Sequence, residues 1–122
     1  MTRAEMVAEF GEPGVQNARM LDLVTVDPAS GRVVLAMIER RPWGADPRQL
    51  GQIEEKINRY LGYVLDGFLA EQYPQYQGKE VLIRLDCAEE PQGEAARFVA
   101  AARHAIESQG LFFTVSAQAV GA

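Results

Sequence analysis

Hydrophobic side chains recur at steps of three and four residues between residues 47 and 70, with polar side chains between them. The apolar positions are Leu50, Ile53, Ile57, Tyr60, Leu61, Val64, Leu65 and Phe68. The positions opposite them are Glu54, Glu55, Asn58, Arg59 and Asp66. This period is that of a helix with one apolar stripe facing the core. The pattern therefore predicts a long amphipathic helix that ends near residue 70.

The sequence also marks both ends of this helix. Asp46 has the side chain of an N-cap, Pro47 suits the first helical position, and Gln49 would complete a capping box. Gly67 interrupts the helical pattern, and we expect a bend there. Pro74 disfavours helix in the residue before it, so the helix should end ahead of this point.

Four stretches carry the β-branched and aromatic residues that are typical of strands. They are residues 20–27, 32–41, 80–86 and 111–116. The turn residues of "PASG" join the first two stretches into a hairpin. The second stretch is apolar on both faces up to its midpoint, which predicts a central strand covered on both sides.

A second helix is expected over "EAARFVAAARHAIESQG", with Gly110 as its stop. The order is then strand, strand, helix, strand, helix, strand. Each strand–helix–strand step favours a right-handed crossover between parallel strands, and the hairpin adds an antiparallel strand. The expected fold class is α+β, a two-layer α/β sandwich with a four-stranded mixed sheet and both long helices on one face.

The chain of 122 residues suits one domain. We expect a single α/β domain over residues 20–117. Residues 1–19 are expected to form an N-terminal segment that is a short helix or partly disordered, and residues 118–122 a flexible tail.

The sheet face away from the helices is expected to be apolar. Its candidate residues are Val24, Val26, Val34, Ala36, Ile38, Leu82, Phe112 and Thr114. Monomeric proteins rarely leave a large apolar patch in water. We therefore expect either the N-terminal segment or a second copy of the chain to cover this face, and a homodimer is the leading expectation.

Composition and charge narrow the possible functions. The net charge of −5 opposes binding to nucleic acid and to anionic membranes. No stretch approaches the roughly 18 to 20 apolar residues of a membrane span. The lone Cys87 cannot form an intrachain disulfide, and the N-terminus has no apolar run of signal-peptide length. We expect a cytoplasmic protein that binds neither nucleic acid nor membrane.

Side chains with catalytic chemistry are few. The single histidine, His104, lies in the second expected helix, and its surroundings match no zinc motif. Cys87 has acidic neighbours, which raise the pKa of a thiol instead of stabilising its thiolate. A Cys87–His104 pair is sterically conceivable. Otherwise we expect no catalytic residue, no metal and no cofactor.

The aromatic residues offer a candidate contact site. Trp43 follows "ERRP", and tryptophan, tyrosine and arginine dominate the energetic centres of interfaces. One hypothesis is that Arg40, Arg41 and Trp43 form a recognition corner for an acidic or extended partner. Tyr73 and Tyr76 are further candidate contacts. The alternative, which we prefer, is that Trp43 caps the core where strand meets helix, with the arginines stacked or solvated.

Four segments together resemble a known family: "VTVDPASGRVVLAMIERRPW", "QLGQIEEKINRYLGYVLDG", a "YP" break and "GLFFTV". The resemblance covers roughly residues 20 to 116 and is to a small bacterial domain family of unknown function. It implies a stand-alone bacterial cytoplasmic domain. Because that family has no assigned activity, the resemblance implies no catalytic residues.

Three hypotheses about function remain. The leading one is a non-catalytic domain that acts through protein–protein contact as a homodimer. The alternative is a domain that binds or senses a small molecule, in a pocket between the sheet and the long helix or at a dimer seam. The third is a small enzyme that uses Cys87 and His104 or carboxylates.

Overall fold

In the computed structural model, residues 14–17 and 21–117 are described. The elements are β1 (Leu23–Val26), β2 (Val33–Glu39), α2 (Gln49–Leu65), α3 (Phe68–Gln72), a 3-10 turn (Pro74–Tyr76), β3 (Val81–Cys87), α4 (Glu94–Ser108) and β4 (Phe112–Ala117). The strands form one sheet in the order β1-β2-β3-β4. The expected α+β fold is confirmed, with the short helix α3 as an addition. The short helix expected in residues 1–19 and the tail over 118–122 lie outside the described residues.

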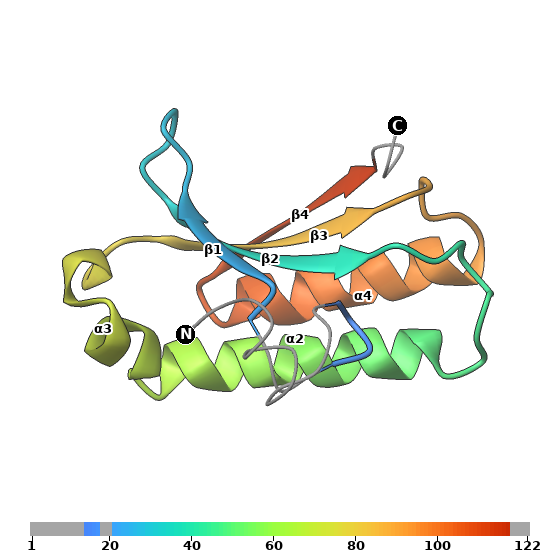
Figure 1. Cartoon of the computed structure of the whole chain (residues 1–122), viewed down its shortest axis with the longest axis horizontal. Helices are drawn as coiled ribbons and strands as arrows, with labels where there is room; N and C mark the ends of the chain where they lie inside the picture. The colour runs from blue at the N-terminus through green and yellow to red at the C-terminus, as the bar shows by residue number, and fades with distance from the viewer. Residues whose placement is uncertain (1–13, 18–20, 118–122) are drawn as a thin grey trace, which may run out of the picture.

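The sheet is mixed, because β1 runs antiparallel to β2 while β2, β3 and β4 are parallel. Both parallel connections step across the sheet in the same direction, so right-handed crossovers place their helices on the same face. Figure 1 shows α2 and α4 side by side along one face of the sheet. The carboxyl ends of the three parallel strands therefore lie near the starts of α2 and α4.

The hydrophobic core fills the space between the sheet and these two helices. Alternate residues of β2 and β3 point into it: Val33, Leu35, Met37, Val81, Ile83 and Leu85. The helices contribute Ile53, Ile57, Tyr60, Val99, Ala102 and Ile106. As expected for a central strand, β2 is buried on both faces. None of the helices in the described part of the chain is long and apolar enough to cross a membrane.

The register of the hairpin corrects one expectation about the open face of the sheet, which is the face without helices. Thr25 pairs with Val34, and directly paired residues point to the same side, so Thr25 shares the open face with Val34. Val24 and Val26 alternate with Thr25 and therefore point toward the helices. The sequence placed them on the open face, and that was wrong. A shift of one residue reverses the facing of a whole strand.

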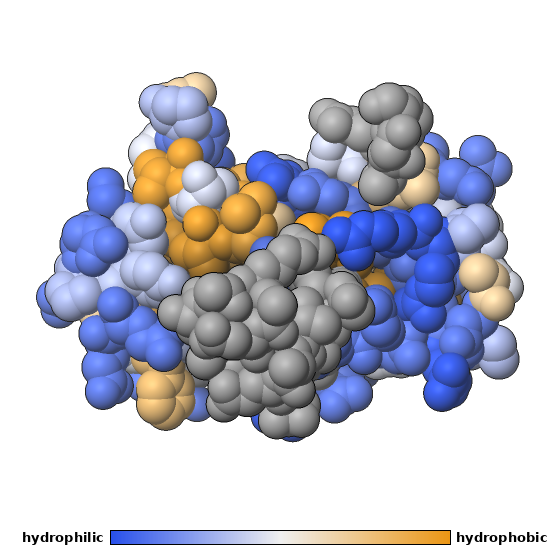
Figure 2. Space-filling view, viewed as in Figure 1, coloured by the Kyte–Doolittle hydropathy of each residue, from blue (hydrophilic) through white to orange (hydrophobic). Residues whose placement is uncertain are grey.

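The open face is also smaller and more polar than expected. Val34 and Ala36 on this face are only 2% and 0% exposed. Arg84 and Asp86 share the face and form an ion pair at 2.7 Å. The most exposed hydrophobic side chain of this face lies at its edge, where Leu23 pairs with Ala36 and is 45% exposed. Figure 2 shows hydrophobic side chains gathered over β1.

The start of α2 differs from the capping box that the sequence predicted. The helix begins at Gln49, and no side chain caps it. The Asp46 carboxylate instead accepts hydrogen bonds from the Arg48 backbone N–H at 2.8 Å and from the Arg48 guanidinium. The Gln49 side chain turns back and accepts from the Gly44 backbone N–H at 2.8 Å. Charge-assisted bonding between Asp46 and Arg48 thus replaces the expected cap.

The far end of the long helix bends at Gly67, as the sequence predicted. Gly67 has a φ of 87°, in the left-handed region, and the chain continues as α3. The last two residues of the apolar stripe lie on either side of this bend and do not reach the core. Leu65 is 51% exposed and Phe68 is 52% exposed, whereas the sequence placed both on the buried side.

Candidate functional site

Trp43 joins two connections that lie at the carboxyl ends of the parallel strands. Its indole Nε1–H donates to the Glu89 carbonyl oxygen at 2.8 Å. Trp43 belongs to the connection between β2 and α2, and Glu89 to the connection between β3 and α4. The ring also packs against the core. The indole therefore braces this corner of the fold, as the preferred interpretation of the sequence predicted.

Arg41 is held by a buried carboxylate. Glu39 is 1% exposed, and the Arg41 Nε and a terminal nitrogen donate to its two oxygens at 2.9 and 2.7 Å. These hydrogen bonds raise the pKa of Arg41. A buried carboxylate without such a partner would be strongly unfavourable. Arg41 thus neutralises Glu39 inside the fold.

A second ion pair stands beside the first. The Arg48 guanidinium lies 2.9 Å from the Asp46 carboxylate, and Arg41 lies 3.8 Å from the same group. Hydrogen bonds from Arg48 lower the pKa of Asp46 to about 2. Arg41 and Arg48, which flank Trp43 in sequence, are therefore both paired with carboxylates.

The five predicted contact residues do not form one site. Arg40 is exposed at the end of β2, next to Arg41 and Trp43. Tyr73 and Tyr76 stack on each other, with ring centroids 5.3 Å apart. They lie beside α3, at the opposite end of the domain from the connection that carries Trp43 (Figure 1). The structure thus separates the tyrosines from the arginine–tryptophan corner.

A cavity of about 310 Å³ opens beside Trp43, between the starts of α2 and α4. Its lining consists of Trp43, Gly44, Asp46, Pro47, Gln49, Leu50, Gln92, Glu94 and Ala95. Gln49 and Asp46 are already engaged within the fold. Gln92 and Glu94 are exposed, and no hydrogen bond or ion pair joins their side chains to other described residues. We call this feature the corner cavity.

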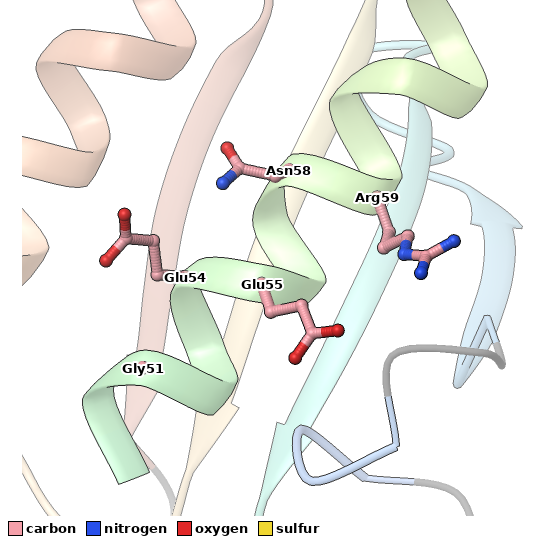
Figure 3. A pocket seen from close by; sticks show the side chains of 5 residues that line it. All are labelled: Gly51, Glu54, Glu55, Asn58 and Arg59. Carbon is pink, nitrogen blue, oxygen red and sulfur yellow. The ribbon is translucent and has the colours of Figure 1, made fainter. Parts of the chain in front are cut away.

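A larger hollow of about 440 Å³ lies along the outer side of α2. It is lined by Gly51, Glu54, Glu55, Asn58 and Arg59, all from this one helix. Figure 3 shows Glu54 and Asn58 pointing to one side of the helix and Glu55 and Arg59 to the other. These side chains diverge, so they form a solvated helix surface and no convergent site.

The two groups that the sequence offered for catalysis lie apart. Cys87 is buried at the carboxyl end of β3, where burial and the nearby acidic groups raise the pKa of its thiol to about 11. His104 is exposed in the last part of α4, far along the helix from the end nearest Cys87. No cluster of three histidine, cysteine or acidic side chains within residues 14–17 and 21–117 could hold a metal ion.

Sequence reasoning missed a buried ion pair. The Lys56 ammonium lies 2.6 Å from an Asp22 carboxylate oxygen, and both side chains are 0% exposed. Lys56 also donates to the backbone carbonyls of Gly14 and Asn17. Burial lowers the pKa of Lys56, while the hydrogen bond and charge of Asp22 oppose that shift. The available signal was the position of Lys56 within the apolar stripe, one turn from Ile53.

This ion pair fastens the segment Gly14–Asn17 to the domain. The Asp22 carboxylate accepts from the Ile38 backbone N–H at 2.9 Å, and the Ile38 carbonyl accepts from Val15 N–H at 2.9 Å. These bonds satisfy the backbone groups of Ile38, which lies in β2 beyond the residues that pair with β1. Val15 is 0% exposed in the core. The Lys56–Asp22 pair is therefore part of the fold.

The outer edge of β1 carries backbone groups that point away from the sheet. The Asp27 N–H donates to Arg32, and hydrogen-bonded pairs alternate along an antiparallel hairpin. The backbone groups of Thr25 thus point toward β2, and those of Val24 and Val26 point away from it. None of the described residues hydrogen-bonds to these outward groups. Residues 23–26 also contain no charge or proline, the usual protection of a sheet edge.

A family model describing a family of unknown function matches residues 14–119. The chain belongs to family DUF6572. The match begins at Gly14, whose carbonyl accepts from Lys56, so the family segment includes the fastened residues. Comparisons with curated proteins and with solved structures find no match. The family assignment confirms the resemblance seen in the sequence, and it implies no particular activity because the function of the family is unknown.

Proposed function

We propose that this DUF6572 domain is non-catalytic and acts through protein contact, as a homodimer joined along β1. The observation that carries this proposal is the unpaired outer edge of β1, with Leu23 exposed beside it. An exposed, uncharged edge strand is a template for pairing with another strand. Most soluble oligomers are two-fold homodimers, in which one surface meets itself.

The geometry of β1 suits pairing with its own copy. Under a two-fold axis at Thr25, the outward backbone groups of Val24 would meet those of Val26 in the second copy. Thr25 would then face the second Thr25 across the axis. This register places every outward N–H opposite an outward carbonyl, as an antiparallel pair requires. The contact would join two four-stranded sheets into one of eight strands.

Three observations favour a contact domain over the enzyme alternative. Cys87 is buried with a raised pKa, and a nucleophilic cysteine needs the opposite environment. His104 lies on the exposed surface of α4, away from Cys87. The arginine pairs around Trp43 are also satisfied within the fold.

The test measures the mass of the particle in solution by sedimentation velocity over a wide range of protein concentration. We expect a concentration-dependent dimer. Thr25→Lys places like charges opposite each other at the axis, which disfavours pairing, and it leaves the core untouched because Thr25 is exposed. Thr114→Lys is the matched control, since Thr114 is exposed on the same sheet face but in β4.

A charge swap makes the test specific. Thr25→Lys alone and Thr25→Glu alone should each be monomeric, and an equimolar mixture should form a heterodimer. A monomer at every concentration would overturn the proposal. A dimer that Thr25→Lys and Thr114→Lys affect equally would show that another surface joins the copies.

A further inference from the structure

The corner cavity has walls that suit an aliphatic chain. Trp43, Pro47, Leu50 and Ala95 supply its apolar surface. Its volume of about 310 Å³ is at the lower end of the range for small-ligand pockets. The cavity therefore suits one side chain or a small molecule of similar size. The hydrogen bond from Trp43 to Glu89 holds the indole in place, so this wall is formed before any ligand arrives.

The polar groups of the cavity determine the charge of the ligand. Asp46 is paired with Arg48, and Gln49 is bonded to backbone groups. Glu94 keeps a carboxylate without a hydrogen bond or ion pair to any described residue, and Gln92 keeps its amide. An apolar indole wall beside a carboxylate is an arrangement that suits a cation on an aliphatic stem.

The acidic side chains around the cavity also favour a cation. The connection between β3 and α4 also carries Glu89 and Glu90, and no ion pair joins either of them to the described residues. The neighbouring arginines Arg41 and Arg48 are paired with carboxylates. A group of unpaired acids raises the local concentration of cations. The starts of α2 and α4 act in the opposite direction, because the positive end of a helix dipole disfavours a cation, so the carboxylate of Glu94 must hold the cation against this effect.

We propose that the corner cavity binds a guanidinium or ammonium group on an aliphatic stem, with the stem against Trp43 and the cation on Glu94. The charge of this ligand is opposite to that of the acidic partner expected from "ERRPW", because Arg41 and Arg48 are paired with carboxylates, whereas Glu94 has no hydrogen bond or ion pair to another described residue. The source is either a basic side chain of a protein or a free small amine or guanidine. The site is independent of the β1 edge and does not require a dimer.

The experiment uses the intrinsic fluorescence of Trp43, which is the only tryptophan of the chain and lines the cavity. The full chain is titrated with N-acetyl-arginine amide and with N-acetyl-citrulline amide, a neutral molecule of nearly the same shape. The arginine probe should shift the emission saturably, and the citrulline probe should not. Glu94→Gln should weaken binding of the arginine probe roughly tenfold.

Glu107→Gln is the control, because Glu107 is exposed on the same helix and outside the cavity. It should bind as the unchanged chain does. Equal binding of the two probes, equal affinities of the two variants, or no saturable shift would each overturn the proposal. Butylguanidine and a capped pentapeptide with a central arginine then separate the sources. Tighter binding of the peptide identifies a protein side chain, and equal or tighter binding of butylguanidine identifies a small molecule.

Discussion

The ammonium of Lys56 and the carboxylate of Asp22 lie 2.6 Å apart, and solvent reaches neither side chain. Lys56→Met removes the cation and leaves Asp22 buried without its counter-charge. Breaking a buried pair from one side costs about 3–5 kcal/mol. We expect the free energy of unfolding to fall by about that amount, measured by urea denaturation.

The other lysine, Lys79, provides the control for this prediction, because it is exposed. Lys79→Met should change the free energy of unfolding by no more than about 0.5 kcal/mol. Similar losses in the two variants would contradict the structural role of the Lys56–Asp22 pair.

The thiol of Cys87 should react slowly in the folded protein. Its pKa is raised from 9.0 to about 11, so the thiolate fraction at pH 8 is about a hundredfold lower than that of an exposed thiol. Mass spectrometry should detect little iodoacetamide adduct on the native chain at pH 8, and complete labelling in urea. Fast labelling of the native chain would restore the catalytic hypothesis for Cys87.

Asp46 should stay ionised far into the acidic range. The guanidinium of Arg48 lowers the pKa of Asp46 from 3.8 to about 2. Because the folded pKa lies below the unfolded value, the stabilisation by this pair is complete above pH 4 and is lost as the pH falls toward 2. The carboxyl carbon shift of Asp46, followed by NMR, should give a midpoint near pH 2. Arg48→Gln should move that midpoint up toward 3.8, and an unchanged midpoint would argue against the pair.

Two glycines of the α2 region should respond in opposite ways to alanine. Gly67 has a φ of 87°, and a Cβ there would meet nothing within 4 Å, so Gly67→Ala adds only backbone strain, about 1 kcal/mol. Gly51 is inside α2, its φ is ordinary for a helix, and the space around it is equally open. Gly51→Ala should therefore stabilise the protein by roughly 0.5–1 kcal/mol. In thermal unfolding, Gly67→Ala should lower the melting temperature and Gly51→Ala should raise it.

The sequence predicts the elements of this fold well where periodicity is strong. The alternation in β3 and the stripe around Ile53, Ile57 and Tyr60 give strand and helix correctly. The facing of β1 was wrong because four residues of mixed character do not define a register. Pairing with β2 determines it, and pairing is a tertiary property.

The site was harder to predict than the fold because the partners of charged groups come from distant parts of the chain. Arg41 is an exception, because its partner Glu39 is only two residues away, but the sequence does not show that Glu39 is buried and therefore needs this counter-charge. Lys56 has its partner, Asp22, 34 residues earlier in the chain, and no local pattern joins the two. The structure shows which charges are paired, and it gives Glu94 no hydrogen bond or ion pair to another described residue.

Pairing of β1 with its own copy would determine how the two ligand sites of a dimer are arranged. A two-fold axis at Thr25 would make the parallel strands of the two copies run in opposite directions. The two corner cavities would then sit at opposite ends of the joined sheet and face away from each other. Such a dimer could not seat two adjacent basic groups of one short peptide. It would act as a bridge between separate partners, and avidity would arise only on a ligand array long enough to span the whole particle.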